Sequence, residues 1–264
     1  MLLGSIAGSW NLEPLQLAPT LVVVALNSPV DALGEDDFFF VHMLQHILLG
    51  DLAPLCFVVG LTGPVLRPVL ALRPVERLRV LAHPLVALPL WAVDLCVWHV
   101  PFLYQAALHH SAVHALEHAL FFTCGALMWA PVVESLPAPQ WFGTGMKLGY
   151  IAVVRVIETI LGNVFIWTSH VFYPWYVHAH PRWGIGAVRD QNLAGVVMMI
   201  EGSFVTFGAL VWLFLRLASE GELRQQLIEQ GLDAEQVSRA VRYGRARALE
   251  LERGGGDGGR PLNS

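Results

Sequence analysis

The chain contains six apolar segments that are long enough, or nearly long enough, to span a membrane, and polar stretches separate them. Their hydrophobic residues form continuous runs and do not alternate as in membrane β-strands, so each run predicts a helix that crosses a bilayer. The first segment is short and spans only if it tilts or the bilayer thins around it. The predicted spans are Pro14–Leu26, Phe38–Leu61, Val80–Tyr104, Ala112–Val133, Gly145–Thr168 and Leu193–Leu217.

The composition agrees with an integral membrane protein. Of 264 residues, 55% are hydrophobic and only 14% are charged, whereas soluble proteins carry about 25% charged residues. We therefore expect the lipid bilayer as a partner and no nucleic acid. Cys56, Cys96 and Cys124 fall inside apolar runs and form no Cys-x-x-Cys pair, which is typical of small buried side chains and not of a disulfide framework.

Basic residues predict the orientation. Cytoplasmic connections of membrane proteins carry the excess of Lys and Arg. The connection after the second segment and the stretch after the sixth hold most of them: Arg67, Arg73, Arg77, Arg79, Arg216, Arg224, Arg239, Arg242, Arg245, Arg247 and Arg253. The connection before the second segment has no basic residue. We therefore expect both termini in the cytoplasm.

The expected organisation is all-α. We predict a transmembrane helical domain over residues 1–218, with about six transmembrane helices and seven as the alternative. A short cytosolic helical tail follows over residues 219–253, with a break at Gly231–Asp233, and residues 254–264 are glycine-rich and expected to be disordered.

Histidines gather at the predicted outer side of the membrane. Ten of the eleven histidines are placed there: His42, His46, His99, His109, His110, His114, His118, His170, His178 and His180. Imidazoles four residues apart lie on one face of a helix and can ligate one ion, and the spans offer two such pairs, at 42/46 and at 114/118. Polar groups inside a membrane are costly and mark function. The predicted metal ligands are His42, His46, His99, His114 and His118.

Other polar residues are candidates for supporting roles. The string His114-x-x-Glu117-His118 matches the inverted zinc-peptidase pattern, but we favour Glu117 as a group that orients an imidazole. Arg155 and Glu158, three residues apart, are expected to pair. Further supporting candidates are Gln45, as a donor to a ligand or a cap of the loop, and Asp94, which is expected to orient the His99 ring or to pair with Arg155. Asp190 is expected to be an outer contact of the site or a helix cap, and His178 and His180 are candidates for ion capture in an outer loop.

Four motifs together resemble the CtaG family of cytochrome c oxidase assembly factors. They are Phe40-Val41-His42-Met43-Leu44-Gln45-His46, Trp98-His99-Val100-Pro101, His114-x-x-Glu117-His118 and Asp190-Gln191-x-x-Ala194-Gly195. The resemblance implies a multi-pass protein of the bacterial inner (plasma) membrane that helps to mature caa-type oxidases. It implies copper as the ion and cytochrome c oxidase subunits as partners. The family usually has seven spans, whereas only about 40 residues precede His42 here, so one span is missing or compressed.

The residues alone leave other functions open. Neutral imidazoles suit copper, zinc, iron and nickel, so the ligand type does not select the ion. The alternatives are a membrane metalloenzyme, either a di-iron oxygenase or a zinc hydrolase, and a haem or copper transporter in which facing helices hold haem. A role without catalysis is favoured over an enzyme.

Overall fold

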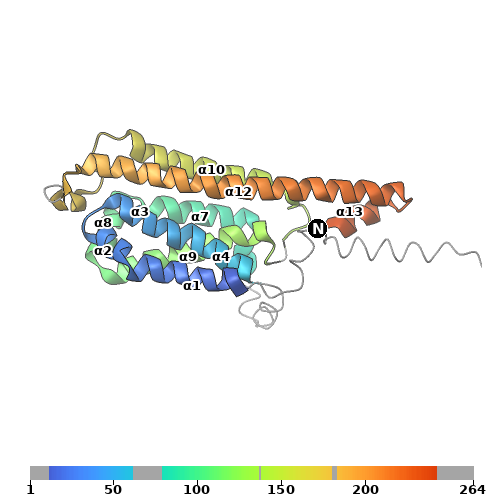
Figure 1. The fold of residues 1–264 in the computed structure, drawn as a ribbon, viewed down its shortest axis with the longest axis horizontal. Coiled ribbons are helices and arrows are strands. Elements are labelled where there is room, and N and C mark those ends of the chain that lie inside the picture. The colour runs from blue at the N-terminus through green and yellow to red at the C-terminus, as the bar shows by residue number, and fades with distance from the viewer. Residues whose placement is uncertain (1–11, 62–78, 137, 180–182, 243–264) are drawn as a thin grey trace, which may run out of the picture. The chain divides into compact units, whose positions relative to one another are not determined.

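The computed structural model of the chain describes residues 12–61, 79–136, 138–179 and 183–242. Throughout these ranges the regular structure is helical, with no strand (Figure 1). The elements are α1 Leu12–Asn27, α2 Pro29–Asp36, α3 Phe39–Ile47, η1 Leu48–Leu52, α4 Ala53–Gly60, η2 Arg79–Ala82, α7 Pro84–Trp98, α8 Pro101–His109, α9 Ser111–Val133, α10 Thr144–Trp167, η3 Pro174–Ala179, α12 Ala187–Glu229 and α13 Ala234–Arg242.

Four helical stretches are long and apolar enough to cross a membrane. They are Phe39–Gly60, which joins α3, η1 and α4, and the three helices α9, α10 and α12. Two bent pairs raise the number to six if each is one span: α1 with α2, bent by 46°, and α7 with α8, bent by 72°. The chain is thus a polytopic helical membrane protein, as the hydrophobic pattern predicts.

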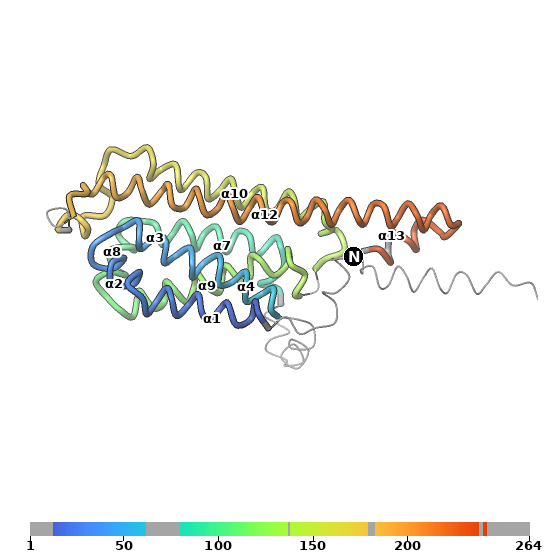
Figure 2. The backbone as a smooth tube through the Cα atoms, in the orientation of Figure 1, coloured from blue at the N-terminus to red at the C-terminus, as the bar shows by residue number. Residues whose placement is uncertain are grey.

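Contacts divide the chain into two compact units. The first comprises Met1–Pro139 and Val153–Val205, and the second comprises Gln140–Ala152 and Thr206–Ser264. In the first unit, α1 packs on α4, while α9 packs on α7, α8, η1 and α4 (Figure 2). The helix α9 is therefore the element around which the N-terminal helices assemble.

The second span contains one widened turn. The segment η1 is a π-helical turn, and it ends just before Pro54. Proline has no N–H to donate to the carbonyl four residues earlier, and its ring clashes with that carbonyl, so a wider turn relieves the conflict at Gly50. The Gly50 carbonyl packs directly against Gly125 of α9, where a side chain would collide with it. The absence of a side chain at Gly125 allows these spans to touch backbone to backbone.

The third predicted span differs from the prediction of one segment over Val80–Tyr104. The helix α7 ends at Trp98, Val100 is extended, and α8 begins at Pro101. The residue before a proline disfavours the helical conformation, so the chain turns at this point. His99 therefore lies at a break between two helices and not at the end of a straight span.

The second unit contains a helical hairpin. Gly231 has a positive φ of 86°, and the Asp233 carboxylate accepts hydrogen bonds from the N–H groups of Glu235 and Gln236. Leu227 of α12 packs with Val237, Ala240 and Val241 in one apolar cluster. The predicted break at Gly231–Asp233 is confirmed. The helix α12 continues without a break from Ala187 to Glu229, across the predicted domain boundary at residue 218, and residues beyond 242 lie outside the described part.

Candidate metal centre

The start of α3 is held by a carboxylate from a distant helix. Phe39 and Phe40 donate their backbone N–H groups to the two oxygens of Asp190, at 2.8 and 3.0 Å. The first turn of a helix leaves such N–H groups without partners, and a carboxylate there also complements the helix dipole. Phe38, the residue before α3, provides no side-chain cap of its own. Asp190 thus fixes the helix that carries His42 and His46.

The first histidine pair is buried inside the bundle. His42 has no exposed surface and His46 is 6% exposed, and their Nε2 atoms lie 2.8 Å apart. The Tyr176 hydroxyl donates to the Gly34 carbonyl at 3.0 Å and lies 3.3 Å from His42 Nδ1. Because that hydroxyl has one proton, its oxygen accepts from His42 Nδ1–H, and the lone pair of His42 Nε2 then accepts from His46 Nε2–H.

The second pair lies in the first turns of α9. The Glu35 carboxylate is 2.9 Å from His114 Nδ1. An ionised carboxylate can only accept, so Nδ1 carries the proton and Nε2 of His114 is free. The His118 ring lies 4.1 Å from the His114 ring between centroids. The Nε2 atoms of His114 and His118 are buried and have no hydrogen-bond partner.

These two pairs form one cluster. One ligand nitrogen from each of His42, His46, His114 and His118 lies within 4.8 Å of the other three. A tetrahedral ion with metal–nitrogen bonds of 2.0–2.1 Å separates its ligands by about 3.3 Å. Small ring movements reach that spacing. A shared cation would replace the contact between His42 and His46 and would satisfy Nε2 of His114 and of His118, which have no other partner. The donor set therefore fits a single metal ion.

Glu117 lies against this cluster without a partner. It has no exposed surface, and neither carboxylate oxygen accepts a hydrogen bond. Nε2 of His46 lies 3.8 Å from Glu117 Oε1, which is too far for a hydrogen bond. A buried carboxyl group without a partner favours its neutral form, and a cation bound by the four imidazoles would favour its ionised form.

His99 stands apart from the four. Its Nδ1 lies 2.7 Å from the Leu95 carbonyl, so Nδ1 donates and Nε2 is free; Nε2 is buried and has no partner. Its ring centroid is 6.4 Å from that of His46. The break before Pro101 thus turns this ring toward His46 but does not bring it into the four-histidine cluster.

Tyrosines from the 171–179 segment cover the cluster. The Tyr173 hydroxyl donates to the His99 carbonyl at 2.8 Å, and Tyr176 contacts the Tyr104 hydroxyl at 2.9 Å. Burial raises the pKa of both Tyr173 and Tyr176 above the usual value for tyrosine. Their hydroxyls therefore stay protonated and keep donating at alkaline pH. Gln191 holds the same segment, because its side-chain oxygen accepts from Phe172 N at 2.7 Å and from Tyr173 N at 3.2 Å.

Three predicted supporting residues have other contacts than expected. Gln45 donates its amide to the Ala25 carbonyl and to Asp31, which joins α3 to α1 and α2. Asp94 faces Trp98 and Cys124 and neither orients His99 nor pairs with Arg155. Asp190 is a helix cap, but of α3 rather than of its own helix.

The remaining predicted residues fall outside the cluster. His178 is exposed and lies against Trp175, with ring centroids 5.9 Å apart. His180 lies outside the described residues. The predicted pair of Arg155 and Glu158 is confirmed, at 3.7 Å. Glu35 and Tyr176, which contact His114 and His42, were not among the predicted site residues. Their only signals in the sequence were an acidic connection before the second span and an aromatic outer loop.

Comparison with known proteins gives one family. The family model described as cytochrome c oxidase caa3 assembly factor matches residues 16–220. No curated protein matches the chain. No solved structure matches it either.

Proposed function

Because the chain belongs to the cytochrome c oxidase caa3 assembly factors, we propose that it binds copper in the four-histidine cluster and delivers the ion to an oxidase subunit. Family membership makes it an assembly factor that associates with the oxidase complex. The copper step goes beyond family membership. One observation carries it, namely that four imidazole nitrogens on α3 and α9 lie within 4.8 Å of one another.

The choice of copper follows from chemistry. Imidazole sites bind Cu²⁺ more tightly than the other divalent ions of the first transition row. A site of four imidazoles therefore favours copper over the other divalent ions without any further selectivity from the protein. The carboxylates beside the cluster, Glu35 and Glu117, have the roles that outer contacts of histidine ligands usually have: one holds a ring in its tautomer, and the other provides charge.

The proposed location is the bacterial plasma membrane, with the cluster near the outer face and both termini in the cytoplasm. His42 and His46 lie in the first half of the Phe39–Gly60 span, and the opposite end of that span leads toward the arginine-rich stretch from Arg67 to Arg79. By the positive-inside rule, this stretch is cytoplasmic. Copper would then reach the cluster from outside the cell.

One observation favours a second function. Glu117 follows His114 by three residues and is a buried carboxylate without a hydrogen bond, which is the arrangement that a zinc hydrolase needs to activate water. Haem is disfavoured, because the facing rings of α3 and α9 lie close together: the His42 and His114 rings are stacked with centroids 5.3 Å apart, and those of His46 and His118 are 5.4 Å apart, which leaves no room for a porphyrin between them.

The experiment is complementation of a deletion strain. His42→Ala and His114→Ala should each lower caa3 oxidase activity and oxidase copper content severalfold while the protein remains in the membrane. His170→Ala, at an exposed histidine outside the cluster, is the matched control and should restore full activity. Wild-type oxidase activity in both cluster variants would refute the proposal, and metal-dependent hydrolysis lost in Glu117→Gln would favour the enzyme.

A further inference from the structure

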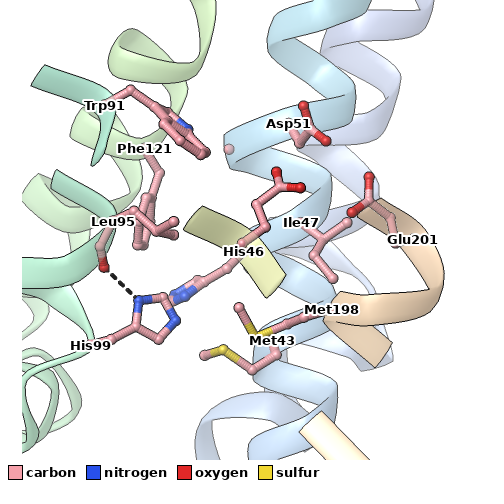
Figure 3. Close-up of a pocket in the computed structure, with 12 residues that line it drawn as sticks. Met43, His46, Ile47, Asp51, Trp91, Leu95, His99, Phe121, Met198 and Glu201 are labelled. Atoms are coloured by element: carbon pink, nitrogen blue, oxygen red, sulfur yellow. Dashed lines mark hydrogen bonds between the residues drawn. The ribbon is translucent and has the colours of Figure 1, made fainter. Parts of the chain in front are cut away.

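A pocket lies next to the four-histidine cluster and shares His46 with it, but none of the other three histidines lines the pocket. Its lining includes His46, His99, Met43 and Met198, and the two rings and the two methionine side chains point into the same space (Figure 3). Met43 is 1% exposed. These four residues come from α3, the α7–α8 break and α12, within the first unit of the chain.

The two imidazoles of this pocket each offer a free nitrogen. His46 Nδ1 and His99 Nε2 are buried and have no hydrogen-bond partner. The two residues are only 6% and 8% exposed. His46 uses its other nitrogen toward the cluster, where Nε2 lies 2.8 Å from His42 Nε2. A neutral imidazole has one lone pair, so occupation of both spaces at once makes His46 a bridging imidazolate, and its ring proton is released when the second ion binds.

The remaining polar lining of the pocket is acidic. Asp51, Glu158 and Glu201 contribute to it, and the nearby positive charge is Arg155, which pairs with Glu158 at 3.7 Å. Buried oxygens of Glu158 and Glu201 have no hydrogen-bond partner. Arg155 balances Glu158, and Asp51 and Glu201 share a proton in the hydrogen bond between them, so the lining keeps one net negative charge, which favours a cation over a neutral or anionic ligand.

We propose that this pocket is a second metal site, which takes a soft monovalent cation, Cu⁺, on the imidazoles of His46 and His99 and the thioethers of Met43 and Met198. Thioether and imidazole donors together select cuprous ion, whereas the four-imidazole cluster accepts several divalent ions. The inference rests on the proposed function for copper as the metal that the chain binds, and the ion enters both sites as Cu⁺, so that no change of oxidation state is needed. His99 is then a ligand of the second site and not the fifth ligand of the first.

The test is a Cu⁺ titration of the purified full-length chain against a chromogenic chelator, with X-ray absorption of the loaded protein. The wild type should bind two cuprous ions per chain and show sulfur neighbours of copper. Met43→Leu with Met198→Leu should lose one ion and the sulfur signal, and Met128→Leu, a buried methionine of α9 outside the pocket lining, should lose neither. His99→Gln should also lose one ion, which gives a second variant should the methionine pair fail to fold.

The same titration separates the two proposals. A variant with His114→Ala and His118→Ala should lose the first ion and retain the sulfur signal. If that variant loses its ion but the wild type shows no sulfur neighbours and the methionine variant binds normally, the second site is refuted and the four-histidine site stands. If only the methionine and His99 variants lose copper, the second site stands and the proposed function fails.

Discussion

The Glu35 carboxylate lies 2.9 Å from Nδ1 of His114, across 79 positions of sequence. It selects the tautomer in which His114 Nε2 is free to ligate. Such outer contacts commonly change metal affinity by about 10–100-fold. We expect Glu35→Gln to weaken copper binding within this range while the protein remains folded, as measured by competition with a chelator.

The control for Glu35 is its neighbour. Asp36→Asn removes a carboxylate from an exposed position of the same helix and should leave the affinity unchanged. Equal affinity losses in the two variants would mean that general negative charge, and not the contact with His114, supports the site.

The cap that Asp190 forms on α3 predicts a combined effect on stability and metal binding. Hydrogen bonds to a charged acceptor are each worth about 1.5–3 kcal/mol, and Asp190→Ala removes two. The start of α3 should then fray, with a lower thermal denaturation midpoint and weaker copper binding. Arg189→Gln, an exposed change one residue earlier, is the control. An unchanged midpoint in Asp190→Ala would contradict the capping role.

The contact of Gly125 with the Gly50 carbonyl predicts that α9 tolerates no side chain there. A Cβ at residue 125 collides with backbone and not with a flexible side chain, so the helices must separate. Overpacking of this kind costs about 1–3 kcal/mol. Gly125→Ala should lower the thermal midpoint and the copper affinity together, whereas Ala119→Val, on an exposed face of α9, should change neither. Normal stability in Gly125→Ala would show that the spans do not touch as described.

The buried tyrosines predict sensitivity to high pH. Burial raises the pKa of Tyr173 above its value in the unfolded chain, so the folded state holds this proton more tightly. The stabilisation is complete below the unfolded pKa of about 10 and is lost as the pH rises past it. Denaturation midpoints measured across pH 8–12 should fall above about pH 10, and less steeply in Tyr173→Phe. An identical alkaline fall in the variant would assign the effect to other groups.

Local patterns were sufficient to predict most of the fold. The stretches Phe39–Gly60, Ser111–Val133 and Thr144–Trp167 agree with the predicted spans within a few residues, because continuous apolar runs of this length have no other stable structure in a membrane. The third span was predicted less well. Pro101 was visible in the sequence, but a proline alone does not determine whether a membrane helix kinks or breaks.

The site was predictable only where its residues are close in sequence. The spacing of His42 with His46 and of His114 with His118 places each pair on one helix face. The positions of His99, Glu35 and Asp190 depend on how α7, α2 and α12 pack, and such contacts span from 79 to 151 positions of sequence. Periodicity along one helix carries no information about them.

The central claim is that imidazoles from α3 and α9 share one copper ion, and electron paramagnetic resonance of the Cu²⁺-loaded protein tests it most directly. Coupling of the copper electron to imidazole nitrogens counts the ligands. The account predicts a signal with imidazole couplings that changes in each of the variants His42→Ala, His46→Ala, His114→Ala and His118→Ala. A spectrum without nitrogen couplings, or one that is identical in all four variants, would contradict it.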